Sequence, residues 1–304
     1  MSNDSKTPDP WYKWLLERRH GGSAEHLPKV QEDVARYRDR VLDAARLAPG
    51  MTLIDVGTGD GLIGLSALER VGPGLRVIMT DISGSLLRHV EEIAEKRGVR
   101  AQCELLQCSA DRLQGIANHT ADVVATRAVL AYVQDKPAAF REFHRVLKPG
   151  GRICLAEPIL QDDAFETCAL TQLVQTQPAH PNIEFLRLLQ RCRAAQYPST
   201  QEAMARNPQT NYSERDLARM AREAGFQHIH LELHIDHRPN LISNWDLFLD
   251  VAPHPLVASL REILSTKFSG EERARFESVM RPVVESGRSM SSEFIAYLNA
   301  TKNP

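Results

Sequence analysis

The chain has 304 residues, of which 42% are hydrophobic and 25% are charged, an ordinary composition for a globular protein that buries its own core. Its 37 Lys and Arg nearly balance its 39 Asp and Glu, so composition does not point to a nucleic-acid partner, which usually needs a concentrated basic surface. No apolar run reaches the roughly 20 residues that span a bilayer, and the polar N-terminus resembles no secretory signal. The five cysteines form no C-x-x-C pair. We therefore expect a cytoplasmic protein without a membrane partner.

The first 48 residues are predicted to be an N-terminal helical segment. Residues 1–10 are expected to be disordered, and a short helix through Trp11 and Trp14 should end at Gly21-Gly22. A second helix is predicted from about Leu27 to Leu47, where apolar side chains recur at helical spacing. The aromatic residues could form a lid over a ligand, although simple docking on the core is the plainer interpretation. Likewise, Arg18-Arg19-His20 could meet an anionic substrate or could end the helix in solvent.

Residues 49–159 alternate between apolar strands and amphipathic helices. Strands are predicted at Met51–Val56, Leu75–Thr80, Ala101–Leu106, Ala121–Thr126 and Arg152–Glu157, and helices at Leu62–Glu69, at Ser83–Lys96 and through Phe140–Leu147, the last ending at Pro149-Gly150-Gly151. Strands alternating with helices predict a parallel sheet that is covered on both faces.

The pattern changes after residue 160. Two helical insertions, 160–211 and 240–287, flank a core segment at 212–239, and residues 288–304 hold a closing strand at Phe294–Ala300. In the core segment, Ser213 is placed to cap a helix over Glu214–Ala224, and Phe226–Asp236 alternates as a strand. The predicted fold is α/β: a Rossmann-like, seven-stranded, mostly parallel sheet with helices on both faces and a helical cap from the two insertions.

The first strand ends in a glycine-rich loop, Asp55-Val56-Gly57-Thr58-Gly59-Asp60-Gly61. A dinucleotide-binding turn would have G-x-G-x-x-G spacing, yet Leu62 stands where its third glycine belongs. Asp55 would repel a pyrophosphate but could hold an ammonium group. Asp81, at the end of the second strand, can accept hydrogen bonds from both hydroxyls of a ribose. The spacing therefore disfavours an NAD-dependent oxidoreductase.

These residues resemble the class I S-adenosylmethionine-dependent methyltransferases. The matching strings are LIDVGTGDG at 53–61, VIMTDIS at 77–83, CSADRL at 108–113, ADVVATRAVLAYVQD at 121–135 and FHRVLKPGGRICLAEP at 143–158. The resemblance implies an S-adenosylmethionine cofactor, with S-adenosylhomocysteine as its product. The residues it places at the cofactor, with Tyr37 added from the N-terminal helix, are Tyr37, Asp55, Gly57, Thr58, Gly59, Gly61, Asp81, Ile82, Ser109, Ala110, Asp111, Arg127 and Ala128.

The chemistry needs little more than positioning, because a sulfonium is an intrinsically good leaving group. Tyr132 takes the position where many family members have a His, and it could orient an acceptor, although a tyrosine is a poor base. Glu157, at the end of the fifth strand, is the second candidate catalytic residue. Either could equally be structural.

The acceptor pocket is expected to come from the two insertions. The candidate residues are His180, Met204, Tyr212, Trp245, Phe248 and His254. A small molecule or a peptide-derived metabolite is the favoured acceptor, and the alternative is a catalytically silent cofactor-binding regulatory module. His228, His230 and His234 share a strand face, but a solvated edge is favoured over a metal site there. The oligomeric state is left open.

Overall fold

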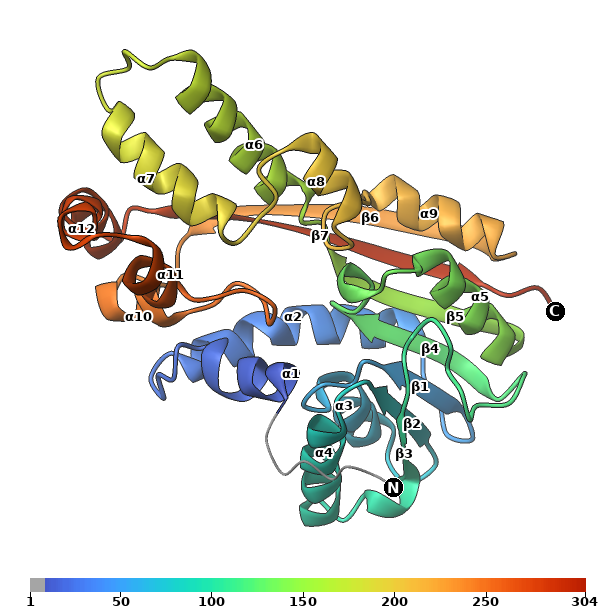
Figure 1. The fold of residues 1–304 in the computed structure, drawn as a ribbon. Coiled ribbons are helices and arrows are strands. Elements are labelled where there is room, and N and C mark those ends of the chain that lie inside the picture. Colours follow the sequence, from blue (N-terminus) through green and yellow to red (C-terminus); the bar gives the residue numbers. More distant parts are fainter. Residues whose placement is uncertain (1–8) are drawn as a thin grey trace, which may run out of the picture.

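The computed structural model describes residues 9–304, and its centre is one seven-stranded sheet (Figure 1). The strands are β1 (Thr52–Val56), β2 (Arg76–Asp81), β3 (Cys103–Gln107), β4 (Ala121–Arg127), β5 (Leu147–Pro158), β6 (Gln227–Pro239) and β7 (Met290–Thr301). Their order is β3-β2-β1-β4-β5-β7-β6. The first five strands run parallel, and β7 is antiparallel to both β5 and β6. The predicted fold class is confirmed.

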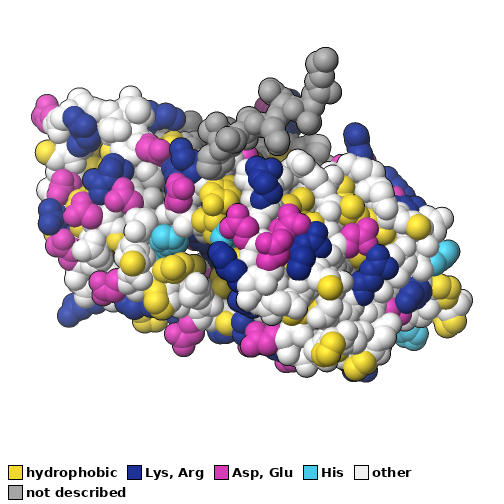
Figure 2. Space-filling view, turned by 90° about the horizontal axis from the view of Figure 1, so that it is seen from below, with side chains coloured by type: hydrophobic (Ala, Val, Ile, Leu, Met, Phe, Trp, Pro, Cys, Tyr) yellow, Lys and Arg dark blue, Asp and Glu magenta, His cyan; other side chains and the backbone are white. Residues whose placement is uncertain are grey.

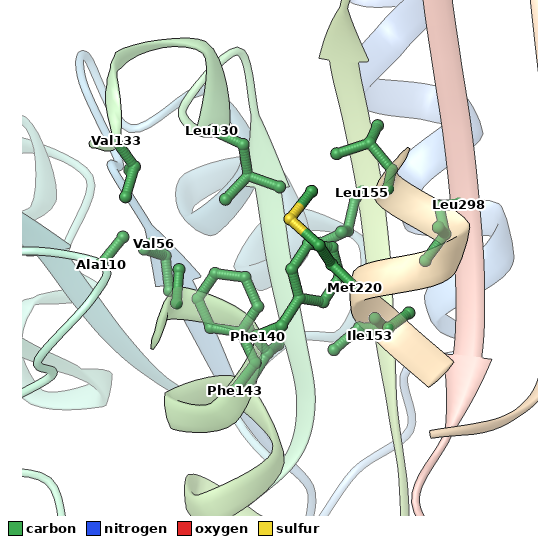
Figure 3. Close-up of a cluster of buried hydrophobic side chains, with 14 of the residues drawn as sticks. Val56, Ala110, Leu130, Val133, Phe140, Phe143, Ile153, Leu155, Met220 and Leu298 are labelled. Atoms are coloured by element: carbon green, nitrogen blue, oxygen red, sulfur yellow. The ribbon is translucent and has the colours of Figure 1, made fainter. Parts of the chain in front are cut away.

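Helices cover both faces of this sheet, as predicted. The core helices are α2 (Leu27–Ala45), α3 (Leu62–Val71), α4 (Gly84–Lys96), α5 (Lys136–Val146) and α9 (Glu214–Glu223). One buried cluster joins α2, α3 and α4 to the sheet, and a second joins α5 and α9 to its other face. In the second cluster, Phe140 and Phe143 of α5 and Met220 of α9 lie against Leu155 and Leu298 of the strands (Figure 3).

The sheet differs from the prediction in where β5 begins. The helix before it stops at Val146, and the strand starts at Leu147 rather than Arg152. Leu147 already pairs with Ala121 of β4, and a register irregularity follows before Val123 pairs with Arg152. The Pro-Gly-Gly sequence is thus accommodated inside the strand as a bulge, a place where such residues are tolerated.

The edge strand β6 also corrects two expectations. Ile229 and Leu231 pack on the core, as its alternation suggests, but Leu233 and Ile235 are 36% and 59% exposed. Its polar face meets α2 as well as solvent: Arg40 forms an ion pair with Glu232, and His230 and His234 both hydrogen-bond to that same carboxylate. Nowhere in residues 9–304 do His, Cys, Asp and Glu side chains gather as a metal site would require.

The two insertions pack on each other. The first contains α6 (Gln161–Thr176), α7 (Ile183–Ala194) and α8 (Gln201–Arg206), and the second contains α10 (Trp245–Asp250), α11 (Leu260–Lys267) and α12 (Gly270–Glu285). Buried side chains of α7, α10, α11 and α12 form a third apolar cluster, separate from those on the sheet. These helices stand beside the sheet at its β6–β7 end (Figure 1).

The N-terminal segment connects this cap to the core. It holds α1 (Pro10–Lys13) and one turn of π-helix, η1 (Trp14–Arg18). The Trp14 indole N–H donates to the Ala252 carbonyl at 2.9 Å, and Arg18 forms an ion pair with Glu262. Of the residues 1–10 expected to be disordered, 1–8 lie outside the described part of the chain, whereas Asp9 caps α1 and Pro10 begins it. Across residues 9–304, no helix combines the length and the apolar character needed to cross a membrane.

Candidate functional site

A cavity of about 380 Å³ lies at the carboxyl ends of the parallel strands, the place where open α/β sheets bind ligands. One wall comes from the segments that follow β1, β2, β3 and β4, and the other comes from the N-terminal segment. The N-terminal wall consists of Trp11, Trp14, Leu15 and Arg19. Of the N-terminal aromatic residues, Trp11 and Trp14 thus line the cavity and Tyr12 does not.

The glycine-rich loop leaves little room for side chains where it faces the segment after β4 and the N-terminal segment. Gly57 has φ of +65°, and a Cβ there would stand 2.5 Å from a methyl group of Val129. Gly59 has φ of +59°, and its Cβ would stand 3.1 Å from Leu15. Because an L-residue is strained at such φ values, glycine is required at Gly57 on both counts. The backbone is thereby exposed to the cavity.

Asp55 holds this loop in shape from beneath. One oxygen of its buried carboxylate accepts from the Thr58 hydroxyl at 2.7 Å and from the Gly64 amide at 2.9 Å. The other oxygen accepts no hydrogen bond within residues 9–304, and Asp55 lines the cavity. Burial raises the pKa of this carboxyl to about 6.

Asp81 ends β2 in the same wall. Its carboxylate accepts from the Gly59 amide at 3.0 Å and from the Ser83 amide at 2.9 Å, and burial raises its pKa. Both oxygens keep lone pairs for further donors, because a carboxylate offers about four acceptor sites. The Ser83 hydroxyl donates to Asp9 at 2.6 Å, which ties the start of the lid to the neighbourhood of Asp81.

The two candidate catalytic residues have different positions. Tyr132 lines the cavity, where its ring meets the edge of Trp11 at 4.9 Å between centroids, and burial raises its pKa to about 12. Glu157 lies outside the cavity lining. Its carboxylate accepts from the Thr126 hydroxyl and from the amides of residues 129 and 130. Glu157 thus holds the loop after β4, and because it is fully buried outside the cavity it is not placed to contact a substrate.

Two arginines face the cavity from opposite walls. Arg127 ends β4, and its guanidinium carbon lies 5.3 Å from the centre of the Tyr37 ring. Arg19 follows the π-helical turn, and its guanidinium carbon lies 5.6 Å from the centre of the Trp14 ring. Burial, followed by the nearby Arg127 charge, lowers the pKa of Arg19 to about 10.

Most of the residues predicted for the cofactor lie around this cavity. Those that line it are Asp55, Gly57, Thr58, Gly59, Asp81, Ile82, Ser109, Ala110, Asp111, Arg127 and Ala128. Gly61 does not line it, because it caps α3. Tyr37 does not line it either, because its hydroxyl hydrogen-bonds to Glu293 outside the cavity.

The residues predicted for the acceptor lie elsewhere, and this differs from the expectation that the insertions build the pocket. None of His180, Met204, Tyr212, Trp245, Phe248 and His254 lines the cavity. Trp245 and Phe248 stack in the apolar cluster of the cap, and the Tyr212 hydroxyl donates to the Pro158 carbonyl at 2.6 Å. The physical reason is that the insertions bury their apolar side chains against each other.

Sequence reasoning missed several cavity residues. Leu62, Ile63 and Leu86 come from the first turns of α3 and α4, and Val129, Val133 and Gln134 follow β4. Their positions directly after strands could have identified them as cavity residues, since such segments meet at one edge of a parallel sheet. Asp60 of the glycine-rich loop also lines the cavity.

Comparison with known proteins identifies the family. Residues 47–225 match the model of the methyltransferase domain. The chain is 36% identical over 120 residues to nocamycin O-methyltransferase of Saccharothrix syringae, a stretch covering 40% of this chain and 42% of that protein. It is 32% identical over 123 residues to the ubiquinone/menaquinone biosynthesis C-methyltransferase of Klebsiella pneumoniae, covering 40% of this chain and 49% of that one. The matched stretch is thus less than half of each relative.

Solved structures share the fold at low sequence identity. Phosphoethanolamine N-methyltransferase 2 of Haemonchus contortus, in complex with S-adenosyl-L-methionine, superposes with a TM-score of 0.52 at 15% identity, covering 97% of this chain and 56% of that one. The [4+2]-cyclase SpnF superposes with a TM-score of 0.52 at 18% identity, covering 90% and 83%.

The family match covers more than half of the chain, so the protein belongs to the class I S-adenosylmethionine-dependent methyltransferases. The resemblance found in the sequence motifs is confirmed, and the NAD-dependent alternative is set aside.

Proposed function

We propose that the protein transfers a methyl group from S-adenosylmethionine to a small molecule or a peptide-derived metabolite. The observation that carries the proposal is the lidded cavity of about 380 Å³ over the glycine-rich loop, a volume typical of small-molecule sites. Trp11, Trp14 and Leu15 cover it, so a macromolecular acceptor would have to displace the lid.

The residues of the loop wall fit this cofactor. The Asp55 oxygen without a protein partner suits the ammonium of the methionine moiety, and the lone pairs of Asp81 suit the ribose hydroxyls. Ala110 and Asp111 are proposed to flank the adenine. A pyrophosphate would instead meet four carboxylates, those of Asp55, Asp60, Asp81 and Asp111.

When bound, S-adenosylmethionine supplies an activated methyl group on a sulfonium. The chain then acts mainly by positioning the acceptor and excluding water. The Tyr132 phenol keeps its proton at neutral pH, since burial raises its pKa to about 12. It would therefore orient an acceptor by donating a hydrogen bond rather than by removing a proton.

The surface supports a small acceptor over a nucleic acid. Basic and acidic side chains are mixed across the face seen in Figure 2, and no broad basic area stands out on it. Binding to a phosphate backbone draws on such an area.

Transfer of a tritiated methyl group tests the proposal. A cell extract would be divided by ultrafiltration into small molecules and retained macromolecules. The full-length protein and labelled S-adenosylmethionine would then be incubated with each fraction separately. We expect the wild-type protein to label small molecules of the ultrafiltrate, and the Asp81→Ala protein to label them little. Label only in macromolecules would overturn the small acceptor. S-adenosylhomocysteine binding without label in either fraction would identify a silent cofactor-binding module.

A further inference from the structure

The cationic side chains of the cavity are few. Of the described residues that line it, only Arg19 and Arg127 carry a positive charge. The loop wall holds four carboxylates, and those of Asp55 and Asp81 are engaged by backbone amides. The cavity is therefore acidic along the strand ends and has two guanidinium groups to offer a ligand.

Neither guanidinium has an anionic partner in the protein. Within residues 9–304, no hydrogen bond or ion pair involves the side chain of Arg19 or Arg127, and each instead lies over an aromatic ring. This is unusual here, because the exposed arginines on the same molecule mostly pair with carboxylates, as Arg36 and Arg238 do. A charge in a covered cavity without a partner is costly, so such a site favours an anionic ligand.

The nearest carboxylates do not fill this role. Asp60 acts on Arg19 from the loop without forming an ion pair. Glu157 lies near Arg127, but it forms no ion pair with it among the described residues, and its oxygens accept from Thr126 and from backbone amides instead. Each guanidinium therefore keeps its hydrogen-bond donors for the cavity.

The cofactor carries a single carboxylate, and one guanidinium group is sufficient to bind it through two hydrogen bonds. Arg19 faces the loop: the Asp60 charge acts on it, and it follows Leu15, whose side chain lies against Gly59. Both guanidinium groups lie near Tyr132, the residue proposed to orient the acceptor, but only Arg127, at the end of β4, shares a wall of the cavity with it. The position of Arg127 is also the more rigid, since β4 pairs with strands on both sides.

We propose that the acceptor is an anion, a carboxylate or a phosphate, and that Arg127 binds its charged group while Arg19 is left to the carboxylate of the cofactor. A guanidinium suits this task because its planar donors can hold two oxygens at once. The inference rests on the proposed function, and it adds the chemical class of the acceptor.

Calorimetric titration of the full-length protein, saturated with S-adenosylhomocysteine, tests it without an identified acceptor. The probes are benzoate, phenyl phosphate and the neutral benzamide. We expect one of the anions to bind at least about tenfold more tightly than benzamide, the range of one charge-assisted hydrogen bond. Tighter binding of benzoate would indicate a carboxylate acceptor, and tighter binding of phenyl phosphate would indicate a phosphate acceptor.

Three variants separate the roles of the arginines. Arg127→Gln should abolish the preference for the anion and change the affinity for S-adenosylhomocysteine little, while Arg127→Lys should retain part of the preference. Arg19→Gln should weaken the binding of S-adenosylhomocysteine but not that of methylthioadenosine, which lacks the amino-acid moiety. Arg215→Gln, at a side chain that is 93% exposed, is the matched control.

Three results would overturn the inference: equal binding of anions and benzamide to the wild type, an unchanged preference in Arg127→Gln, or a loss of S-adenosylhomocysteine affinity in Arg127→Gln that methylthioadenosine does not share. In each case the cofactor still binds, so the proposed function stands. Failure of the wild type to bind S-adenosylhomocysteine would instead contradict the proposed function itself.

Discussion

The two walls of the cavity are built in different ways. The loop wall belongs to the sheet: Asp55 and Asp81 are buried, and backbone amides from neighbouring segments fix their carboxylates. The lid wall is attached by a few side-chain contacts distant in sequence, such as those of Trp14 with Ala252 and of Asp9 with Ser83. Since local opening costs little where few contacts hold a segment, we expect the loop wall to be the more rigid of the two and the lid wall to open more readily.

The largest effect is expected at the loop wall. Asp81→Ala should weaken S-adenosylhomocysteine binding by tenfold or more, because hydrogen bonds to a charged group contribute about 1.5–3 kcal/mol each. Isothermal titration calorimetry measures this. Asp246→Ala, at a side chain that is 78% exposed, should bind as the wild type does. Unchanged affinity in a folded Asp81→Ala protein would refute the placement of the ribose.

Gly57→Ala tests the close approach between the loop and the segment after β4. The left-handed backbone alone should cost about 1–2 kcal/mol of unfolding free energy, and the contact with Val129 should add to it. Adding Val129→Ala should relieve only the contact. Urea denaturation gives both values, and a Gly57→Ala protein as stable as the wild type would show that the loop is not strained there.

The pH dependence of cofactor binding tests Asp55. The pKa of its carboxyl is raised to about 6, chiefly by burial, so lowering the pH through about 6 protonates it and removes its attraction for the ammonium group. The affinity of the wild type for S-adenosylhomocysteine should therefore fall over this range. Asp55→Asn should bind more weakly at neutral pH and vary much less. Parallel pH curves for the two proteins would contradict the assignment.

The smallest effect is expected at the lid wall. Trp14→Phe keeps an aromatic ring but loses the hydrogen bond to Ala252, worth about 0.5–1.5 kcal/mol. Faster amide hydrogen exchange over residues 10–18 should result, with little change in cofactor affinity. Tyr12→Phe is the control, because the Tyr12 hydroxyl makes no hydrogen bond within residues 9–304. Exchange as slow as in the wild type would show that this bond does not hold the lid.

The sequence predicted the loop wall well for a physical reason. Strand ends of a parallel sheet meet at one edge, so residues such as Asp55, Asp81 and Asp111, far apart in the chain, could be brought together by the pattern of strands alone. The same local signals gave the helix over 214–223, where Ser213 caps the first turn together with Asp216.

The second wall could not be predicted in this way. Nothing local indicates that Trp14 contacts Ala252, or that Trp245 and Phe248 turn into the cap rather than toward the cofactor loop. These choices depend on how separate helices pack, and apolar residues at helical spacing fit several partners equally. For the same reason, the exposure of Leu233 and Ile235 could not be foreseen from their alternation.

A crystal structure of the protein with S-adenosylhomocysteine would test the central claim most directly. We predict that the ribose hydroxyls hydrogen-bond to Asp81, that the amino-acid end lies over the loop at 55–59, and that the guanidinium of Arg127 remains free of the ligand beside Tyr132. S-adenosylhomocysteine bound outside this cavity, or with its carboxylate on Arg127, would contradict the account.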